Sequence, residues 1–330
     1  MNKNLRKALS AVAAASLATG IAFSASSGAD AASKITVAAV FGGTYDSFWS
    51  SVACGAAAQA KAMGVNYKPF VTVASDDATL NQSFNSARLV KPNGIIINPL
   101  NPDMFATQQR AFLKKGVPVV TINGASSPAQ YRVVGTDSTG TSHLAGIKAL
   151  VPSGAGKIAI INGVPGLVPV DTRLNPVIDA VAAANPSLKK LEPQYTFFDK
   201  NKASSSTTAL LVANPDIKVI IAGTGPDGEG VAAAVKAAGL KGKVTVIALD
   251  ATPGEVSSLR EGVITGLVAQ SPTRLGALQM KTVVDYLKKN PKAKAITPSA
   301  TKIGVPQKLL TTANLSAPEN QDWVYKATCK

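Results

Sequence analysis

The sequence predicts an α/β protein with two similar Rossmann-like lobes, each built on a parallel β-sheet. Three observations lead to this prediction. Short apolar runs alternate with helical segments, which is typical of βαβ units and parallel sheets. The alternation restarts near residue 157, after about five units. The chain also has 330 residues, which is enough for two lobes.

The first half of the chain contains the first set of predicted elements. An apolar run at 35–40 indicates a buried strand. The helix that follows is expected at 48–63, because Gly64 fits a helix C-cap. Further helices are expected to begin at Asp76 or Asp77 and at Pro102, and further strands at 67–73, 94–98, 117–122 and 131–136.

The second half repeats the pattern after a change of lobe near Asp137 and Ser138. The carboxyl ends of parallel strands meet at one edge of a sheet, where ligands bind in open α/β folds, so we expect a cleft there. The predicted strands are 157–162, 192–198, 217–222, 244–249, 263–269 and 301–305, and the predicted helices are 171–184, 202–213, 228–238, 253–260 and 272–289.

The sequence of residues 1–31 is typical of a signal peptide. Lys3, Arg6 and Lys7 form a positive start, an Ala-rich apolar run follows, and residues 29–31 fit an A-x-A cleavage site. A membrane anchor is the alternative, but the run is short and Gly20 interrupts it. We therefore expect export to the periplasm, or to the outer side of the membrane, with the mature chain beginning near residue 32.

Export determines how the two cysteines are interpreted. Outside the cytoplasm, Cys54 and Cys329 favour a disulfide, which would join the first helix to the extreme C-terminus. Two cysteines and one histidine, far apart in sequence, do not provide the spaced ligands of a zinc site. We expect neither a metal nor a cofactor.

The chain is strongly basic, with 34 Lys and Arg residues against 19 Asp and Glu residues. The net charge is +15, and removal of three basic residues and one acidic residue with the leader leaves +13. Nucleic-acid binding is one interpretation. However, no basic run exceeds two residues and no groove-reading motif is present. We expect no nucleic acid, and a solvated basic surface that favours encounters with an acidic partner or a membrane.

Two adjacent aromatic residues, Phe48 and Trp49, follow the first predicted strand and a short polar loop. Neighbouring residues lie about 100° apart on a helix, so both cannot point squarely into a core. The alternative is that both belong to the core face of the helix. Because they stand at the carboxyl end of a strand, we expect at least one to contact a ligand.

The segment from Gly223 to Gly228 matches G-x-G-x-x-G between a strand and a helix, and Asp250 follows 22 residues later. This is the form of a dinucleotide-binding fingerprint. Pro226 is unusual in such a loop, and an exported protein rarely meets NAD. Glycines also suit any tight turn that a small ligand approaches, which is the interpretation we favour.

Catalytic motifs are scarce. There is no G-x-S-x-G elbow, and the lone His143 is expected to be structural or exposed. A pair of strand-end carboxylates could serve a glycosidase, but carboxylates beside aromatic rings also suit recognition of a sugar or polyol. Arg173 could donate to ligand oxygens in a forked geometry. The carboxylates at or near predicted strand ends are Asp46, Asp171, Asp199 and Asp250.

Six short segments then point to a known family: Asp46-Ser47-Phe48-Trp49, Ile97-Asn98-Pro99, Asp171-Thr172-Arg173, Phe198-Asp199, Leu249-Asp250-Ala251-Thr252-Pro253 and Ala269-Gln270-Ser271-Pro272. In these segments, and over residues 34 to about 305, the chain resembles the type I periplasmic solute-binding proteins of ABC importers. The resemblance is to their ribose-binding-like group.

The resemblance implies the composition of a binding site. Phe48 and Trp49 would hold the ligand against Phe198, while charged and amide groups bond its hydroxyls. The residues implied for those bonds are Asp46, Asn123, Arg173, Thr224, Asp250 and Gln270.

Two segments depart from the family pattern. Thr224 stands where the family usually has an asparagine, and Asn123-Gly124 stands where sugar-binding members typically carry an Asp-Arg pair. The loss of that pair removes two charged contacts from the first lobe, so the ligand is expected to differ from a common pentose or hexose. A smaller polyol, a cyclitol, a less oxygenated sugar or another small polar solute is expected instead.

The resemblance also implies the mechanism and the lobes. The first lobe would comprise 32–137 and 271–299, and the second 138–270 and 300–330, with three hinge crossings near 137, 270 and 300. The chain would act as a monomer without catalysis, closing on its ligand and docking on an ABC permease. A secreted enzyme acting on glycosides and a chemoreceptor-type sensor protein are the alternatives. A transcription regulator shares the fold but would carry a DNA-binding segment where this chain has an export signal.

Overall fold

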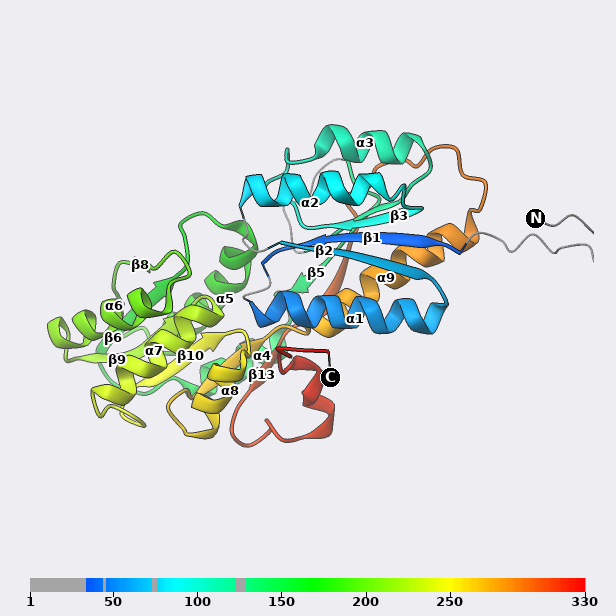
Figure 1. The fold of residues 1–330 in the computed structure, drawn as a ribbon. Helices are drawn as coiled ribbons and strands as arrows, with labels where there is room; N and C mark the ends of the chain where they lie inside the picture. The colour runs from blue at the N-terminus through cyan, green and yellow to red at the C-terminus, as the bar shows by residue number, and fades with distance from the viewer. Residues whose placement is uncertain (1–33, 44–45, 73–75, 123–128, 330) are drawn as a thin grey trace, which may run out of the picture. The chain divides into compact units, whose positions relative to one another are not determined.

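The computed structural model describes residues 34–43, 46–72, 76–122 and 129–329, which form two sheets with helices around them (Figure 1). The predicted signal peptide and Asn123-Gly124 lie outside the described residues. Among those that are described, no helix combines the length and the apolar character needed to cross a membrane.

The first sheet is entirely parallel, as predicted. Helices α2 (Asp77–Leu89) and α3 (Ala106–Lys114) cover one face, and α1 (Ser47–Met63) and α9 (Pro272–Lys289) cover the other (Figure 1). The order of strands is β12 (Lys302–Pro306), β5 (Arg132–Asp137), β4 (Val119–Ile122), β3 (Gly94–Ile97), β1 (Thr36–Phe41) and β2 (Asn66–Val71).

The second sheet is parallel except for its last strand, β13, which is antiparallel to β11. Its helices are α4 (Thr141–Leu150), α5 (Val168–Ala184), α6 (Lys200–Ala213), α7 (Gly225–Ala237) and α8 (Pro253–Arg260). The strand order is β13 (Lys308–Leu310), β11 (Gly266–Ala269), β10 (Thr245–Leu249), β9 (Ile217–Ala222), β6 (Gly156–Asn162) and β7 (Leu188–Lys190), with β8 (Gln194–Tyr195) also on β6.

Alternation of side chains along each strand builds the two cores of a lobe. In β1, Val37, Ala39 and Phe41 face the core that contains α1 and α9. Ala38 and Val40 face the core that contains α2 and α3. Because both faces are covered, the strand is apolar throughout, which explains the continuous apolar run in the sequence.

The predicted third crossing between the lobes was misplaced. We expected the crossing near Ala300, but β12 pairs in parallel with β5 of the first sheet. The chain therefore passes to the second sheet at Gln307, between β12 and β13. Of the five residues of β12, only Val305 is buried, so the sequence pattern indicated a strand but not the sheet that accepts it.

The predicted disulfide is present. Cys54 of α1 and Cys329 are bonded, with their Cα atoms 5.1 Å apart. The tail before Cys329 contains a 3₁₀ helix, η1 (Pro318–Trp323). Its path is fixed further by the backbone N–H of Lys326, which donates to Ser51 Oγ at 2.6 Å. The tail is thus attached to a helix of the first sheet.

Helices α1 and α9 approach each other closely because each carries a glycine at the contact. A Cβ atom at Gly276 would overlap the carbonyl oxygen of Val52. A Cβ atom at Gly55 would overlap the carbonyl oxygen of Thr273. Both obstacles are backbone atoms, so neither can move aside as a side chain can.

We predict that Gly276→Ala destabilises the protein, although alanine raises helix propensity by about 1 kcal/mol. Forcing the helices apart should lower the free energy of unfolding by about 1–3 kcal/mol in denaturant titration. Gly140→Ala is the control, because a Cβ atom there meets only the His143 ring, at 3.5 Å. Equal stability of the two variants would contradict the prediction.

Candidate functional site

Asp250 occupies a strained position at the carboxyl end of β10. Its φ is +91°, a region that non-glycine residues rarely adopt. Its side chain is nearly buried, and its backbone N–H donates to the carbonyl oxygen of Val268 at 3.1 Å. Such a conformation costs about 1–3 kcal/mol and persists only where surrounding contacts impose it.

Four hydrogen bonds hold the Asp250 carboxylate. Oδ1 accepts from Arg173 Nη1 at 2.8 Å, from Gln270 Nε2 at 2.9 Å and from the Tyr325 hydroxyl at 2.7 Å. Oδ2 accepts from the backbone N–H of Gly225 at 3.2 Å. The guanidinium balances the charge of the buried carboxylate, which would otherwise be very costly to desolvate.

Arg173 reaches Asp250 from the second turn of α5. Its Nε donates to the carbonyl oxygen of Pro169 at 3.2 Å, which orients the guanidinium on the helix. None of the described residues supplies a hydrogen-bond acceptor to Nη2. The arginine therefore has donors left for a ligand oxygen.

Gln270 joins the two sheets at a chain crossing. It follows β11 directly, and its Oε1 accepts from the hydroxyl of Thr136 in β5. Its amide nitrogen meanwhile bonds Asp250. One side chain thus contacts a strand of the first sheet and the central carboxylate of the second.

Asp46 lies at the start of α1 and caps it, accepting from the backbone N–H of Phe48 at 2.8 Å. Burial raises the pKa of Asp46 to about 6, and the negative charge of Asp250 adds to the rise, although the Phe48 N–H and Arg173 oppose it. Asp46 therefore lies within electrostatic reach of the network around Asp250.

Phe48 and Trp49 point in different directions, as their adjacency requires. The Phe48 ring is buried and meets the Trp49 ring edge-on, with centroids 4.9 Å apart. Trp49 stacks on Phe41 at 6.2 Å and is only partly buried. The ring of Phe48 also packs against Tyr325, at 5.8 Å. Tyr325 therefore connects the aromatic pair with the Asp250 network.

Phe198 lies in a second strained segment, after β8. Phe197 and Phe198 have φ values of +58° and +63°. The Phe198 ring covers Gly163, where a Cβ atom would come within 2.6 Å of the ring. Phe198 is 38 % exposed as a residue, and among the described residues its ring makes no contact with the ring of Phe48 or Trp49. Its predicted place opposite them stays a prediction.

The glycine-rich loop at the start of α7 is occupied by the protein's own carboxylates. The Thr224 hydroxyl donates to Asp227 at 2.6 Å, and Asp227 also accepts from Thr196. The N–H of Gly225 is bonded to Asp250. Two carboxylates at this helix N-terminus would repel a pyrophosphate, which argues against dinucleotide binding.

Tyr325 was not among the residues predicted from the sequence. Burial, together with the charge of Asp250, raises the pKa of Tyr325 well above its usual range, so its hydroxyl remains a donor at neutral pH. A signal was available in the sequence, since Trp323 and Tyr325 are two aromatic residues close to Cys329. The predicted disulfide already placed this tail beside the helix that carries Phe48.

Several other sequence-predicted groups lie outside the network. Asn123 is outside the described residues. His143 is buried in α4, and burial lowers its pKa, consistent with a structural role. Asp199 caps α6 by accepting from Asn201 and Lys202. In the described part of the chain, no cluster of His, Cys, Asp and Glu could hold a metal ion.

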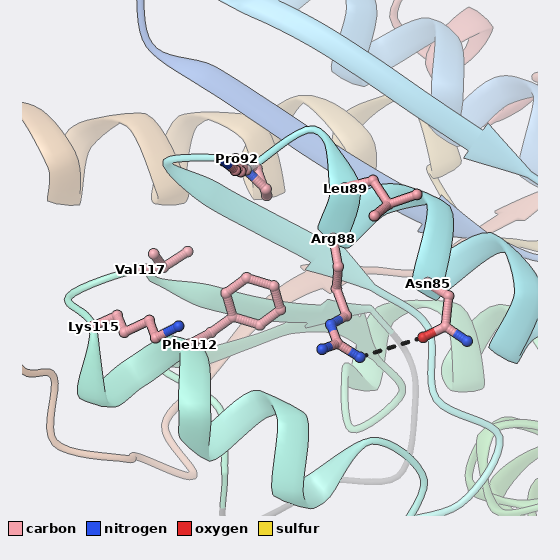
Figure 2. A pocket seen from close by; sticks show the side chains of 8 residues that line it. Asn85, Arg88, Leu89, Pro92, Phe112, Lys115 and Val117 are labelled. Atoms are coloured by element: carbon pink, nitrogen blue, oxygen red, sulfur yellow. Dashed lines mark hydrogen bonds between the residues drawn. The ribbon is translucent and has the colours of Figure 1, made fainter.

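A hollow of about 520 Å³ lies elsewhere, between the C-terminal ends of α2 and α3. Figure 2 shows Asn85 and Arg88 from α2, and Phe112 and Lys115 from the end of α3, around it. Pro92 and Val117, which also line the hollow, precede β3 and β4, so it lies at the amino ends of these strands, the edge opposite to the strand ends where Asp46 and Phe48 lie. Its basic residues complement the negative ends of two helices, which is sufficient reason for their presence.

Comparison with known proteins identifies similar molecules. The profile of the periplasmic binding protein domain matches residues 37–291, ending before the tail that carries Tyr325. The chain is 28 % identical to the D-allose-binding periplasmic protein of Escherichia coli, over 72 % of this chain and 80 % of that protein. It is 26 % identical to a ribose import binding protein of the same organism, over 89 % of this chain and 98 % of that protein.

Solved structures give the same picture of the fold. A carbohydrate transporter solute-binding protein from Agrobacterium radiobacter, in complex with D-arabinose, has a TM-score of 0.74 and 26 % identity, covering 89 % of this chain and 99 % of that one. An ABC transporter solute-binding protein from Agrobacterium vitis, bound to α-D-tagatopyranose, has a TM-score of 0.76 and 23 % identity. The match covers 89 % of this chain and 100 % of that one.

The raised pKa of Asp46 predicts how stability depends on pH. Folding raises this pKa from 3.8 to about 6, so its contribution to stability is present below pH 4 and is lost as the pH rises through 6. Asp46→Asn keeps an N-cap but stays neutral. The ligand-free variant should match the wild type near pH 4 and be more stable at pH 7.5, by at most about 3 kcal/mol.

Thermal and denaturant unfolding between pH 4 and 8 measure this difference. Asp76→Asn is the control, because Asp76 caps α2 while exposed and its pKa is lowered by hydrogen bonds with Thr79. Folding lowers the pKa of Asp76, whereas it raises that of Asp46, so the ionised form of Asp76 stabilises the protein. The Asp76→Asn variant should therefore be less stable than the wild type at neutral pH. Parallel pH profiles for wild type and Asp46→Asn would contradict the prediction.

Proposed function

The chain belongs to the family of periplasmic binding protein domains, and from this we propose that it is an exported sugar-binding component of an ABC importer. The proposal assigns it a small, uncharged, polyhydroxylated ligand, bound without chemical change at the strand ends around Asp250. Relatives named for D-allose and ribose, and a similar structure holding D-arabinose, support a sugar over other polar solutes.

The observation that carries the proposal is the network of Arg173, Asp250 and Gln270. A sugar hydroxyl both donates and accepts, so it needs an acceptor and a donor side by side. Oδ1 of Asp250 already accepts three hydrogen bonds, whereas Oδ2 accepts one. Oδ2 can therefore accept from one ligand hydroxyl, and Arg173 Nη2 can donate to a neighbouring oxygen.

The aromatic pair supplies the second part of the proposed site. The C–H faces of a sugar ring are apolar and pack on aromatic rings, as apolar groups generally do. Trp49 is the partly buried member of the pair, so its ring is the one we assign to the ligand, with Phe48 behind it. Phe198, partly exposed after β8, is the proposed opposite wall.

Closure about three crossings is the proposed mechanism. The chain passes between the sheets after Asp137, after Gln270 and at Gln307, which divides the lobes at about these residues. Contacts from both lobes would make the ligand bind the closed form more tightly, and this difference drives closure. The closed form would then deliver the solute, as a monomer, to a membrane permease.

Export is the proposed localisation. The predicted leader and the bonded pair Cys54–Cys329 support it, because disulfides persist in oxidising compartments. The mature chain would then reach its sugar on the outer side of the cytoplasmic membrane.

An enzyme acting on glycosides has less support. Such an enzyme needs two carboxylates free to face the scissile bond. Of the strand-end carboxylates, that of Asp46 instead caps α1, that of Asp199 caps α6, and that of Asp250 already accepts four hydrogen bonds. Stoichiometric binding with full recovery of the sugar, against turnover, separates the two functions.

Calorimetric titration tests the proposal, with D-ribose, D-allose, D-arabinose, a cyclitol and glycerol as ligands. At least one sugar should bind stoichiometrically and be recovered unchanged. Absence of binding by every sugar would contradict the proposed function.

For the sugar that binds, we predict that Trp49→Ala weakens affinity at least about tenfold, because it removes the apolar face of the site. Phe112→Ala is the matched control, since it removes a ring from the hollow at the opposite edge. It should leave affinity unchanged. Loss of binding in Phe112→Ala alone would place the ligand in that hollow instead.

A further inference from the structure

Tyr325 brings the C-terminal tail into the candidate site. Its hydroxyl donates to Asp250 Oδ1 at 2.7 Å, and Gln270 Nε2 lies 3.4 Å from the same hydroxyl oxygen. Its backbone N–H donates to the carbonyl oxygen of Ala251 at 3.0 Å. Its ring packs against Phe48, with centroids 5.8 Å apart. One buried side chain therefore contacts both halves of the proposed sugar site.

The tail that carries Tyr325 is anchored on both sides of the residue. Upstream, Ser271 Oγ donates to the carbonyl oxygen of Asp322 at 3.0 Å. Downstream, Lys326 bonds Ser51, and Cys329 is covalently bonded to Cys54. The tail follows β13, which belongs to the second sheet, and ends on α1, which covers the first. The disulfide thus completes a fourth covalent link between the lobes, beside the three chain crossings.

The hydroxyl of Tyr325 determines which oxygen of Asp250 is available. A carboxylate oxygen has about two lone-pair sites, and Oδ1 is already shared by three donors. This crowding leaves Oδ2 as the oxygen that can accept from a ligand. Without the phenol, Oδ1 would have capacity to spare, and the carboxylate would no longer be held in one orientation on its strained backbone.

We propose that Tyr325 is a positioning residue of the sugar site, which orients the Asp250 carboxylate and supports the Phe48 ring, and that the Cys54–Cys329 disulfide holds it in place. The inference rests on the proposed sugar-binding function. A purely structural tail would contribute to stability alone, and its loss would leave the affinity of the folded protein unchanged.

Tyr325→Phe tests the hydroxyl, because it keeps the ring on Phe48 and the backbone bond to Ala251. Affinity for the sugar that the wild type binds best, among D-ribose, D-allose and D-arabinose, should fall about tenfold, as expected for a hydrogen bond to a charged group. Tyr286→Phe is the control, since Tyr286 lies on α9 against Tyr131. It should bind like the wild type.

The double variant Cys54→Ser with Cys329→Ser tests the anchor. In the presence of Tyr325 its affinity should fall severalfold. The same change in the Tyr325→Phe protein should cost less, because the hydroxyl contact with Asp250 is already lost there and only the support of the Phe48 ring remains to be lost. Circular dichroism melts establish that each protein is folded at the titration temperature.

Four results would overturn the proposed function, the role of Tyr325 or the role of the disulfide. If the wild type binds none of the sugars, the proposed function fails, and the inference with it. If the wild type binds and Tyr325→Phe binds equally well, only the inference fails. Equal losses in Tyr325→Phe and Tyr286→Phe would also overturn it. Independent, additive losses from the tyrosine and the disulfide would overturn the role assigned to the disulfide.

Discussion

The buried charge of Asp250 is the constraint on which the arrangement of the site depends. A carboxylate removed from water needs a cation and a full set of donors. Here these come from α5, from the end of β11, from the start of α7 and from the C-terminal tail. Segments far apart in sequence are therefore brought to one point by the same charge. The shape of the proposed sugar site follows from the positions of the groups that bond this carboxylate.

Of the five non-glycine residues with positive φ in the described part of the chain, three lie at the same edge of the second sheet, and the other two are Lys91 and Phe105. Asp250, Phe197 and Phe198 all have left-handed φ values, although none is a glycine. The regular sheet behind them supplies the compensating stability, because its strands are buried on both faces. A fold with a well-packed interior can hold a few residues in unfavourable conformations at the strand ends, and two of these residues, Asp250 and Phe198, are the ones assigned to the proposed ligand.

The sequence predicted the sheets well because strands covered on both faces form unmistakable apolar runs such as Gly94–Ile97. Resemblance to a family selected Arg173, Asp250 and Gln270, which the structure brings together. It could not supply Tyr325, whose contact with Asp250 depends on the path of the tail around α1. Nor could a pattern assign β12 to its sheet, because an edge strand with one buried residue carries little information. The left-handed backbone at Phe198 could not be predicted either, because no glycine stands there to indicate a positive φ.

The close contact between α1 and α9 has a mechanical consequence. Backbone nearly touches backbone at Gly55 and Gly276, so the two helices cannot slide or tilt independently. The amino end of α1 carries Phe48 and Trp49, and the amino end of α9 directly follows the crossing at Gln270. Phe48 and Trp49 and the residues that follow the crossing therefore belong to one rigid pair of helices. In the proposed closure, rotation at the crossing would therefore move these rings together with α9, which would link the angle of closure to the fit of the proposed ligand.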